Sequence, residues 1–350
     1  DKPACLITGA GAGIGGTSPS ALRAKATTPS WCDAATRLAS TALPDARILA
    51  SRADGAGRSV VLALDLAEGA PLIFRHDGRS DPGPDGQFAR SVAAQRLARV
   101  RMQGNLHGLR VPRVLAELPD ACVVLMEAAP GQQAAALIET APDNAARRAV
   151  LTACGRWLSG FHTAGRQSRR AYQTRFVLAS LAERRAALSG GQVSACDAGL
   201  LLRLISAVEA SAEGHEGRLA LHGQQHGDFT LRALLIDEGA VSAIDFRPEH
   251  HAPVGYDIMR FLVDYVTLYG DHRKIRDGQL LSNADRAAFF AGYNSAKTND
   301  AAIGFLAGVQ VIQDWLRLPA YPARHSLVQT LRFSGLRESA MRLFPQLRPD

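Results

Sequence analysis

The chain has 350 residues, of which 47% are hydrophobic and 21% charged, and this length suits one large core or two lobes of a globular protein. No apolar run reaches the roughly 18 residues of a membrane span, and the five widely spaced cysteines form no Cys-x-x-Cys pair, which predicts reduced thiols, a cytoplasmic location and no membrane partner. The formal charge of +7 is scattered along the chain, and aromatic residues that could stack on bases are few. No nucleic-acid partner is therefore expected.

Residues 1–30 are predicted to form a Gly-rich leader. The stretch from Ala4 to Gly15 resembles the cofactor turn of short-chain dehydrogenases, and Tyr293 with Lys297 imitates the Tyr-x-x-x-Lys pair of that family. However, Pro19 interrupts the helix that should follow the turn, and the tyrosine lies far beyond one dehydrogenase domain. An NAD(P)-dependent dehydrogenase is therefore kept as a remote alternative.

Residues 31–127 are rich in short strand-like runs and are predicted to form an N-terminal lobe. A helix is predicted over 31–42 and another over 88–101, and a Gly-containing turn, Asp54 to Arg58, joins two of the strands. Pro130-Gly131 marks the crossover that follows the lobe. The predicted strands cover residues 47–50, 59–66, 71–75, 111–114 and 121–126.

Residues 128–350 are predicted to form a larger, mainly helical lobe. Apolar residues from Val150 to Phe161 recur at helical spacing on one face, which is typical of a core helix. The fold class expected from both halves is α+β with two lobes. Further helices are predicted near 173–188, 197–212, 256–269, 284–294, 300–317 and 325–343.

Two aspartates at the edges of short apolar runs are the candidate chemical groups. Asp228 lies in His226-Gly227-Asp228-Phe229, and Asp245 follows Ile244 at the end of the next β-like segment. Between them, an acidic residue before Gly239 separates two apolar runs, which predicts a β-hairpin. A hairpin of this kind can bring the two carboxylates close together, as phosphate transfer requires.

At these residues the chain resembles the aminoglycoside phosphotransferase and choline kinase family. The resemblance covers about residues 45–270 and implies a protein-kinase-like fold, with a small antiparallel-sheet N-lobe and a larger helical C-lobe. Further pieces that match the family, in order, are Pro71 to Arg75, Val111 to Val114, Met126 to Gly131, Leu158 to His162, and Gly255 to Asp257.

The resemblance implies an ATP-dependent phosphotransferase that uses Mg²⁺ and transfers the γ-phosphate to a hydroxyl of a sugar, amino sugar or amino alcohol. It makes Asp228 the catalytic base and Asp245 the metal ligand, while His226 and Asp257 are scaffold residues. The residues that it implies for nucleotide binding are Arg75 and Arg58 at the phosphates and Met126, Glu127 and Ala128 at the adenine.

Three positions depart from the family pattern. Ala233 stands where an Asn would help to hold magnesium, and Arg75 replaces the usual Lys of the third strand. The helix over 88–101 contains no Asp or Glu to pair with that cation, and Gln95 is its nearest polar substitute. A pseudokinase, which would bind or scaffold a protein partner with little catalysis, is therefore the main alternative.

Overall fold

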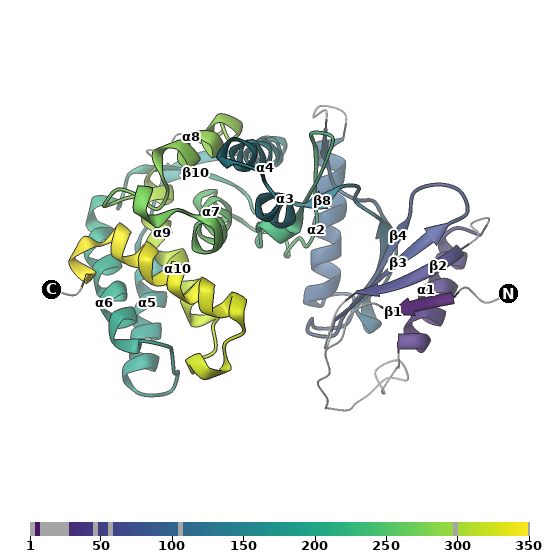
Figure 1. Cartoon of the computed structure of the whole chain (residues 1–350), viewed down its shortest axis with the longest axis horizontal. Coiled ribbons are helices and arrows are strands. Elements are labelled where there is room, and N and C mark those ends of the chain that lie inside the picture. Colours follow the sequence, from purple (N-terminus) through teal and green to yellow (C-terminus); the bar gives the residue numbers. More distant parts are fainter. Residues whose placement is uncertain are drawn as a thin grey trace. The chain divides into compact units, whose positions relative to one another are not determined.

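The computed structural model describes residues 4–7, 28–44, 48–54, 59–103, 108–296 and 300–348 (Figure 1). Contacts divide the chain into two compact units, the first made of Asp1–Pro130 and Ser242–Glu249, and the second of Gly131–Val241 and His250–Asp350. Most of residues 1–30 lies outside the described residues, so the predicted division into a leader, 31–127 and 128–350 stays a prediction.

The first unit contains a six-stranded sheet in the order β1-β2-β3-β4-β7-β6. Only β1 and β2 pair in parallel, whereas the other neighbours are antiparallel. This sheet is not a doubly wound one, which the dehydrogenase alternative would require. The elements of this unit are β1 (Ala4–Ile7), α1 (Thr28–Ala42), β2 (Ile48–Asp54), β3 (Ser59–Leu66), β4 (Leu72–Asp77), α2 (Gln87–Met102), β5 (Leu109–Arg110), β6 (Val114–Leu118) and β7 (Val123–Glu127).

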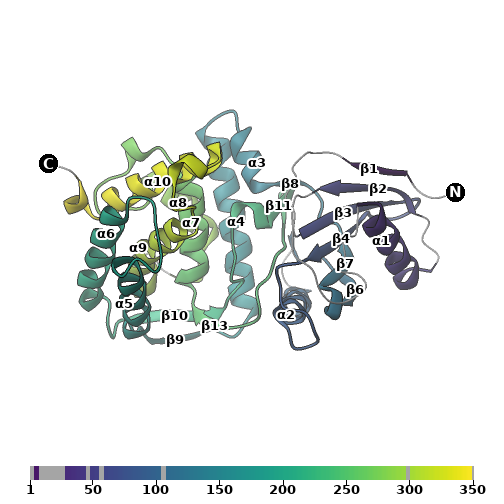
Figure 2. The ribbon, with the colours of Figure 1, turned by 90° about the horizontal axis from the view of Figure 1, so that it is seen from below.

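Helices α1 and α2 cover opposite faces of this sheet (Figure 2). Trp31 of α1 packs in a core with Phe74 of β4 and Leu125 of β7, while Phe88 of α2 packs against Met126. Side chains alternate between the faces of a strand, so neighbours in sequence point to different helices. This alternation determines which side chains of β4 point away from the core under α1 and are available to the candidate active site.

Two strands begin later than the sequence predicted, for local reasons. The predicted strand over 111–114 is interrupted at Pro112, which has no N–H to donate to a ladder, and pairing resumes at Val114. The predicted strand over 121–126 starts at Val123 because Cys122 adopts a left-handed backbone with φ 51°.

The second unit is mainly helical. Its core is formed by large buried side chains such as Trp157, Phe261 and Trp315. Among the described residues, none of the helices is both long enough and apolar enough to span a membrane. Strand β12 (Ala240–Ala243) begins in this unit and ends in the first. The other elements are β8 (Gln132–Gln133), α3 (Ala134–Glu139), α4 (Asn144–Ala164), β9 (Ser168–Ala171), α5 (Arg175–Ser189), α6 (Ala198–Ser211), β10 (Leu219–Gln224), β11 (Leu234–Asp237), β13 (His251–Pro253), α7 (Gly255–Tyr269), α8 (Asn283–Gly292), α9 (Ala301–Leu316) and α10 (Leu327–Leu343).

The predicted hairpin is formed by β11 and β12, which are neighbours in a small sheet. Its two-residue turn is Glu238-Gly239, with φ values of 46° and 83°. Two consecutive positive φ values characterise the type I′ turn, whose twist matches that of the flanking strands. The acidic residue before glycine therefore predicted this turn correctly.

Helices α7 and α10 pack closely where they cross (Figures 1 and 2). The backbone of Gly335 in α10 lies against that of Thr267 in α7, and a Cβ added at Gly335 would come within 2.1 Å of the Thr267 carbonyl oxygen. Three residues earlier on each helix, Arg332 pairs with Asp264. Together, the two contacts fix the place at which α10 crosses α7.

We expect Gly335→Ala to destabilise the protein by about 1–3 kcal/mol, because the added methyl group has to push two packed backbones apart. Chemical denaturation of both proteins would measure the difference. The matched control is Gly199→Ala in α6, where a Cβ would meet open space and alanine favours the helix by up to about 1 kcal/mol. Equal stability of Gly335→Ala and the wild type would contradict the close approach.

Candidate active site

The loop that carries His226 and Asp228 is held by the buried carboxylate of Asp257, on the first turn of α7. Its oxygens accept hydrogen bonds from the backbone N–H of His226 at 2.7 Å and of Gly227 at 2.9 Å, and the ring of His162 lies at 3.2 Å. Burial would raise the pKa of Asp257, but the hydrogen bond and charge of His162, together with His226, hold it below the usual value. The carboxylate is therefore an ionised anchor for the loop.

His226 is completely buried and packs among aromatic rings. Trp157 of α4 meets its ring edge-on at 6.0 Å, and Phe229 lies at 5.6 Å. Its Nδ1 atom lies 3.4 Å from the backbone N–H of Asp228. These contacts fit the predicted scaffold role, because they fix the loop without presenting the imidazole to a ligand.

The side chain of Asp228 is a quarter exposed and is oriented by an arginine. The Nε atom of Arg260, on α7, donates to Oδ1 of Asp228 at 2.9 Å, and its Nη1 atom donates to both oxygens of Asp314, on α9, at 3.0 and 3.2 Å. The charges of Asp314 and Asp228 raise the pKa of Arg260, although burial opposes this. A permanent cation thus links the candidate base to the helical core.

A second ion pair supports the same loop. Asp264 of α7 accepts the backbone N–H of Leu231 at 3.1 Å and pairs with Arg332 of α10 at 2.7 Å. Leu231 belongs to the short 3₁₀ turn Leu231–Ala233, which follows Asp228. The loop is therefore tied to α7 at both ends, by Asp257 and by Asp264.

In the first unit, Arg75 on β4 pairs directly with Asp245. Arg75 also lies 3.8 Å from Asp77, two residues further along the same face of the strand. Gln95 of α2 is not its partner, because the Gln95 amide donates to the Pro112 carbonyl oxygen at 3.0 Å. Helix α2 has no acidic residue that could pair with Arg75. The guanidinium group pairs instead with Asp77 of the same strand and with Asp245, in the segment after β12.

Asp77 is well suited to stay ionised beside this arginine. Burial would raise the pKa of Asp77, but hydrogen bonds from the Arg79 N–H at 3.0 Å and the Ser80 hydroxyl at 2.9 Å, with the charge of Arg75, hold it below the usual value. Asp77 was not predicted. The alternation of Arg75 and Asp77 along a strand was the signal that could have identified it.

Asp245 adopts a left-handed backbone with φ 67°. An aspartate tolerates this conformation better than most residues, but it is uncommon and costs energy outside glycine. Strain of this kind concentrates at functional sites, which supports a functional role for this residue. Its side chain is less than half exposed and faces Arg75.

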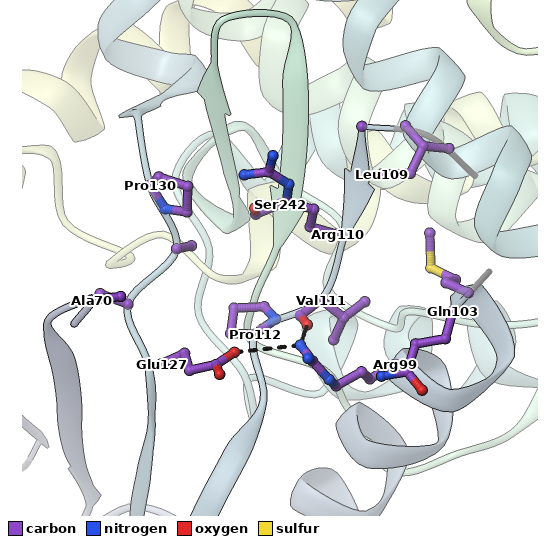
Figure 3. Close-up of a pocket in the computed structure, with 14 residues that line it drawn as sticks. Ala70, Arg99, Gln103, Leu109, Arg110, Val111, Pro112, Glu127, Pro130 and Ser242 are labelled. Carbon is purple, nitrogen blue, oxygen red and sulfur yellow. Dashed lines mark hydrogen bonds and ion pairs between the residues drawn. The ribbon is translucent and has the colours of Figure 1, made fainter. Parts of the chain in front are cut away.

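An open cavity of about 610 Å³ borders the segment Glu127–Pro130 (Figure 3). Glu127 points to its wall, where Arg99 lies 3.5 Å away and also donates to the Val111 carbonyl oxygen at 2.7 Å. Neither Arg75 nor Asp245 lines this cavity. It is therefore separate from the Arg75–Asp245 pair, and Met126, whose side chain packs under α2, does not line it either.

The remaining predicted residues divide into three groups. Ala233 is buried in the 3₁₀ turn, where its methyl group offers no metal ligand. Arg58, Gly9 to Gly15 and Lys297 lie outside the described residues. Tyr293 is buried, with its hydroxyl 2.9 Å from Nδ1 of His162, which is not the position of a dehydrogenase acid open to a substrate.

We expect Asp257→Asn to destabilise the protein by about 3 kcal/mol near neutral pH, because a buried charged acceptor of several hydrogen bonds is lost. The pKa of Asp257 is lowered on folding, so its contribution is present above the unfolded value of about 3.9 and disappears as pH falls through the folded value. Urea denaturation from pH 7 to pH 3 should show the difference between wild type and variant closing below about pH 4.

The control for this experiment is Asp143→Asn at the exposed N-cap of α4, where asparagine caps a helix as well as aspartate. Its stability should stay within roughly 0.5 kcal/mol of the wild type. A difference between wild type and Asp257→Asn that stayed constant down to pH 3 would refute the anchoring role of the ionised carboxylate.

Comparison with solved structures shows proteins of the same fold at low sequence identity. A putative fructosamine-3-kinase from Thermobifida fusca is 19% identical, with a TM-score of 0.51 over 87% of this chain and 97% of the other. A choline/ethanolamine kinase family protein from Mesorhizobium loti is 15% identical, with a TM-score of 0.53 over 90% and 95%. A glucosamine kinase in complex with glucosamine, ADP and inorganic phosphate is 15% identical, with a TM-score of 0.55 over 90% and 86%.

These likenesses confirm the predicted α+β, kinase-like fold. No curated protein sequence matches the chain. The model of the phosphotransferase enzyme family matches residues 52–298, which include both candidate aspartates. Of the ion pairs described above, only those formed by Arg332 and by Asp314 extend beyond the matched residues. From this match over most of its length, the chain belongs to the phosphotransferase enzyme family.

Proposed function

We propose that the protein transfers the terminal phosphoryl group of ATP to a hydroxyl group of a small molecule. The observation that carries this proposal is the Arg75–Asp245 pair. It joins a permanent cation, which can bind phosphate oxygens, to the carboxylate of Asp245, which can bind a metal ion and whose backbone is held in the left-handed conformation. The structural neighbours, which include kinases of fructosamine and glucosamine by name, support small hydroxyl compounds as acceptors.

Asp228 would act as the general base. Its carboxylate accepts the proton of the acceptor hydroxyl while the hydroxyl oxygen forms a bond to the γ-phosphorus. The bond between the γ-phosphorus and the bridging oxygen breaks, and ADP leaves with that oxygen. Arg260 holds the Asp228 carboxylate in one orientation, so it would act as a positioning residue.

The residues around Asp245 fit a magnesium ion that takes few protein ligands. Magnesium usually binds one or two carboxylates and completes its octahedron with phosphate oxygens and water. Asp245 supplies one such carboxylate, and Ala233 supplies none, since its methyl group cannot coordinate a cation. When bound, the ion would neutralise charge on the phosphates during transfer.

The nucleotide contacts expected from the sequence remain part of this proposal. Arg75, held by Asp77 on its own strand, would bind the phosphates, with Arg58 as a second cation. The backbone of Met126, Glu127 and Ala128 would bind the edge of the adenine. A lysine paired with a helix glutamate would thus be replaced by an arginine paired with a strand aspartate.

The proposal is tested with Asp228→Asn and Asp245→Asn, by measuring ADP formation with glucose, glucosamine and choline as trial acceptors and Mg²⁺-dependent ATP binding by calorimetry. Asp228→Asn should lower turnover by about 10²- to 10⁴-fold with ATP binding retained, because only proton transfer is lost. Asp245→Asn should abolish the magnesium dependence of ATP binding. Asp85→Asn, in an exposed loop, is the control.

If Asp245→Asn and the wild type bind ATP equally and neither forms ADP with any acceptor, the protein is a pseudokinase and the proposal fails. If ADP forms equally in the wild type and in Asp228→Asn, the assignment of the base is wrong while the phosphotransferase remains.

We expect Asp77→Asn to weaken ATP binding by roughly fivefold, which corresponds to about 1 kcal/mol, because Arg75 loses one of the two carboxylates that orient it. Calorimetric titration with ATP and Mg²⁺ measures this loss. Asp120→Asn on the same unit is a matched control, and its ATP affinity should equal that of the wild type. Unchanged or tighter binding by Asp77→Asn would show that Asp77 does not position Arg75.

A further inference from the structure

Both ring nitrogen atoms of His162, a completely buried residue of α4, have hydrogen-bond partners. Its Nε2 atom lies 3.2 Å from Oδ2 of Asp257, and its Nδ1 atom lies 2.9 Å from the hydroxyl oxygen of Tyr293, the residue that follows α8. An ionised carboxylate can only accept, so Nε2 carries a proton and donates it to Asp257. The ring is therefore held from two sides, by an anion and by a hydroxyl group.

The hydroxyl of Tyr293 suits either state of the ring. Burial and the negative charges of Asp257 and Asp300 raise the pKa of this hydroxyl, so it keeps its proton. A hydroxyl group can donate to a neutral Nδ1 atom and can accept from a protonated one. In both cases the contact keeps the same face of the imidazole toward Tyr293, and Nε2 stays directed at the carboxylate.

Close packing of α8 on α4 fixes the position of this hydroxyl (Figure 1). A Cβ added at Gly292 would come within 2.0 Å of the Thr152 carbonyl oxygen, so the two helices meet there backbone to backbone. The ring of Tyr293 stacks on that of Phe289, with centroids 5.9 Å apart, and only 1% of Tyr293 is exposed. The hydroxyl therefore has no room to leave His162.

The constraint on His162 continues into the loop that carries the candidate base. The same Oδ2 atom of Asp257 that faces His162 also accepts the backbone N–H of His226 at 2.7 Å, and Oδ1 accepts that of Gly227 at 2.9 Å. Asp228 is the next residue. If Nε2 of His162 turned away, a buried carboxylate oxygen would lose a donor and its hold on the loop would weaken.

We propose that Tyr293 is a positioning residue of the candidate active site, which acts on Asp228 through His162 and Asp257. This inference rests on the proposed function. A phenylalanine would keep the ring packed on Phe289 but would give Nδ1 of His162 no partner, so the neutral imidazole could carry its proton on either nitrogen. With the proton on Nδ1, a lone pair of Nε2 faces the carboxylate and the hydrogen bond is lost.

The test compares Tyr293→Phe with Tyr172→Phe in protein labelled with ¹⁵N at histidine and glycine. Tyr172 is a matched control, because it is also a buried tyrosine of the second unit but its hydroxyl has no hydrogen-bond partner among the described residues. Tyr293→Phe should change the ring ¹⁵N chemical shifts of His162 and should speed hydrogen exchange at the amides of His226 and Gly227 by roughly fivefold, the effect of one weakened hydrogen bond. Tyr172→Phe should change neither.

ADP formation with ATP, Mg²⁺ and glucose, glucosamine or choline gives a second measurement. Tyr293→Phe should lower kcat by roughly tenfold and leave the KM for ATP within about twofold of the wild type, because the base is displaced while the proposed nucleotide contacts are untouched. The double variant His162→Gln/Tyr293→Phe should have the kcat of His162→Gln alone, since a glutamine amide can donate to Asp257 without help from residue 293.

Three results would each overturn the proposal: unchanged His162 shifts and amide exchange in Tyr293→Phe, equal changes in Tyr172→Phe, or a kcat of Tyr293→Phe equal to that of the wild type. The shifts and the exchange are measured without catalysis, so the two proposals can fail separately. If the wild type forms no ADP, the proposed reaction is refuted, while changed shifts and faster exchange in Tyr293→Phe still support Tyr293 as the residue that holds the loop.

Discussion

The buried carboxylate of Asp257 is the constraint on which the geometry of the candidate site depends. It accepts the backbone N–H groups of His226 and Gly227 and meets the ring of His162, so it links the loop to α7 and α4 at once. A buried charge is tolerated only when it is paired and fully hydrogen-bonded, which makes this arrangement specific rather than interchangeable. Asp228 extends from the loop that Asp257 holds.

Arginine performs two tasks around the candidate site, and the family pattern assigns one of them, at Arg75, to lysine. Arg75 replaces a lysine and takes its counter-charges from Asp77 and Asp245, while Arg260 joins Asp228 to the core. A guanidinium group suits both positions because its planar fork can bind two carboxylates in different directions, which a lysine ammonium does less well. The loss of the helix glutamate is therefore compatible with an oriented phosphate-binding cation.

Local patterns were sufficient to predict most of the elements. The helices near residues 256–269 and 325–343 and the turn at Glu238-Gly239 follow from periodicity and from the preference of glycine for positive φ. The strand predicted over 111–114 was misplaced because Pro112 interrupts pairing with a neighbour that sequence spacing does not reveal. Gln95 was a reasonable partner for Arg75 by residue type, but it is directed to a backbone carbonyl instead.

The sequence by itself determined the family, the fold class and the two candidate aspartates, since a short ordered series of motifs and the periodicity of apolar residues carry this information along the chain. Only the tertiary structure decided which charges meet. Arg260 acquires its role from Asp228 and Asp314, which lie 32 and 54 residues away, and Arg75 pairs with Asp245, which lies 170 residues away. Ion pairing depends on distances of a few ångströms between side chains, and no spacing in the sequence encodes them until strands and helices have packed.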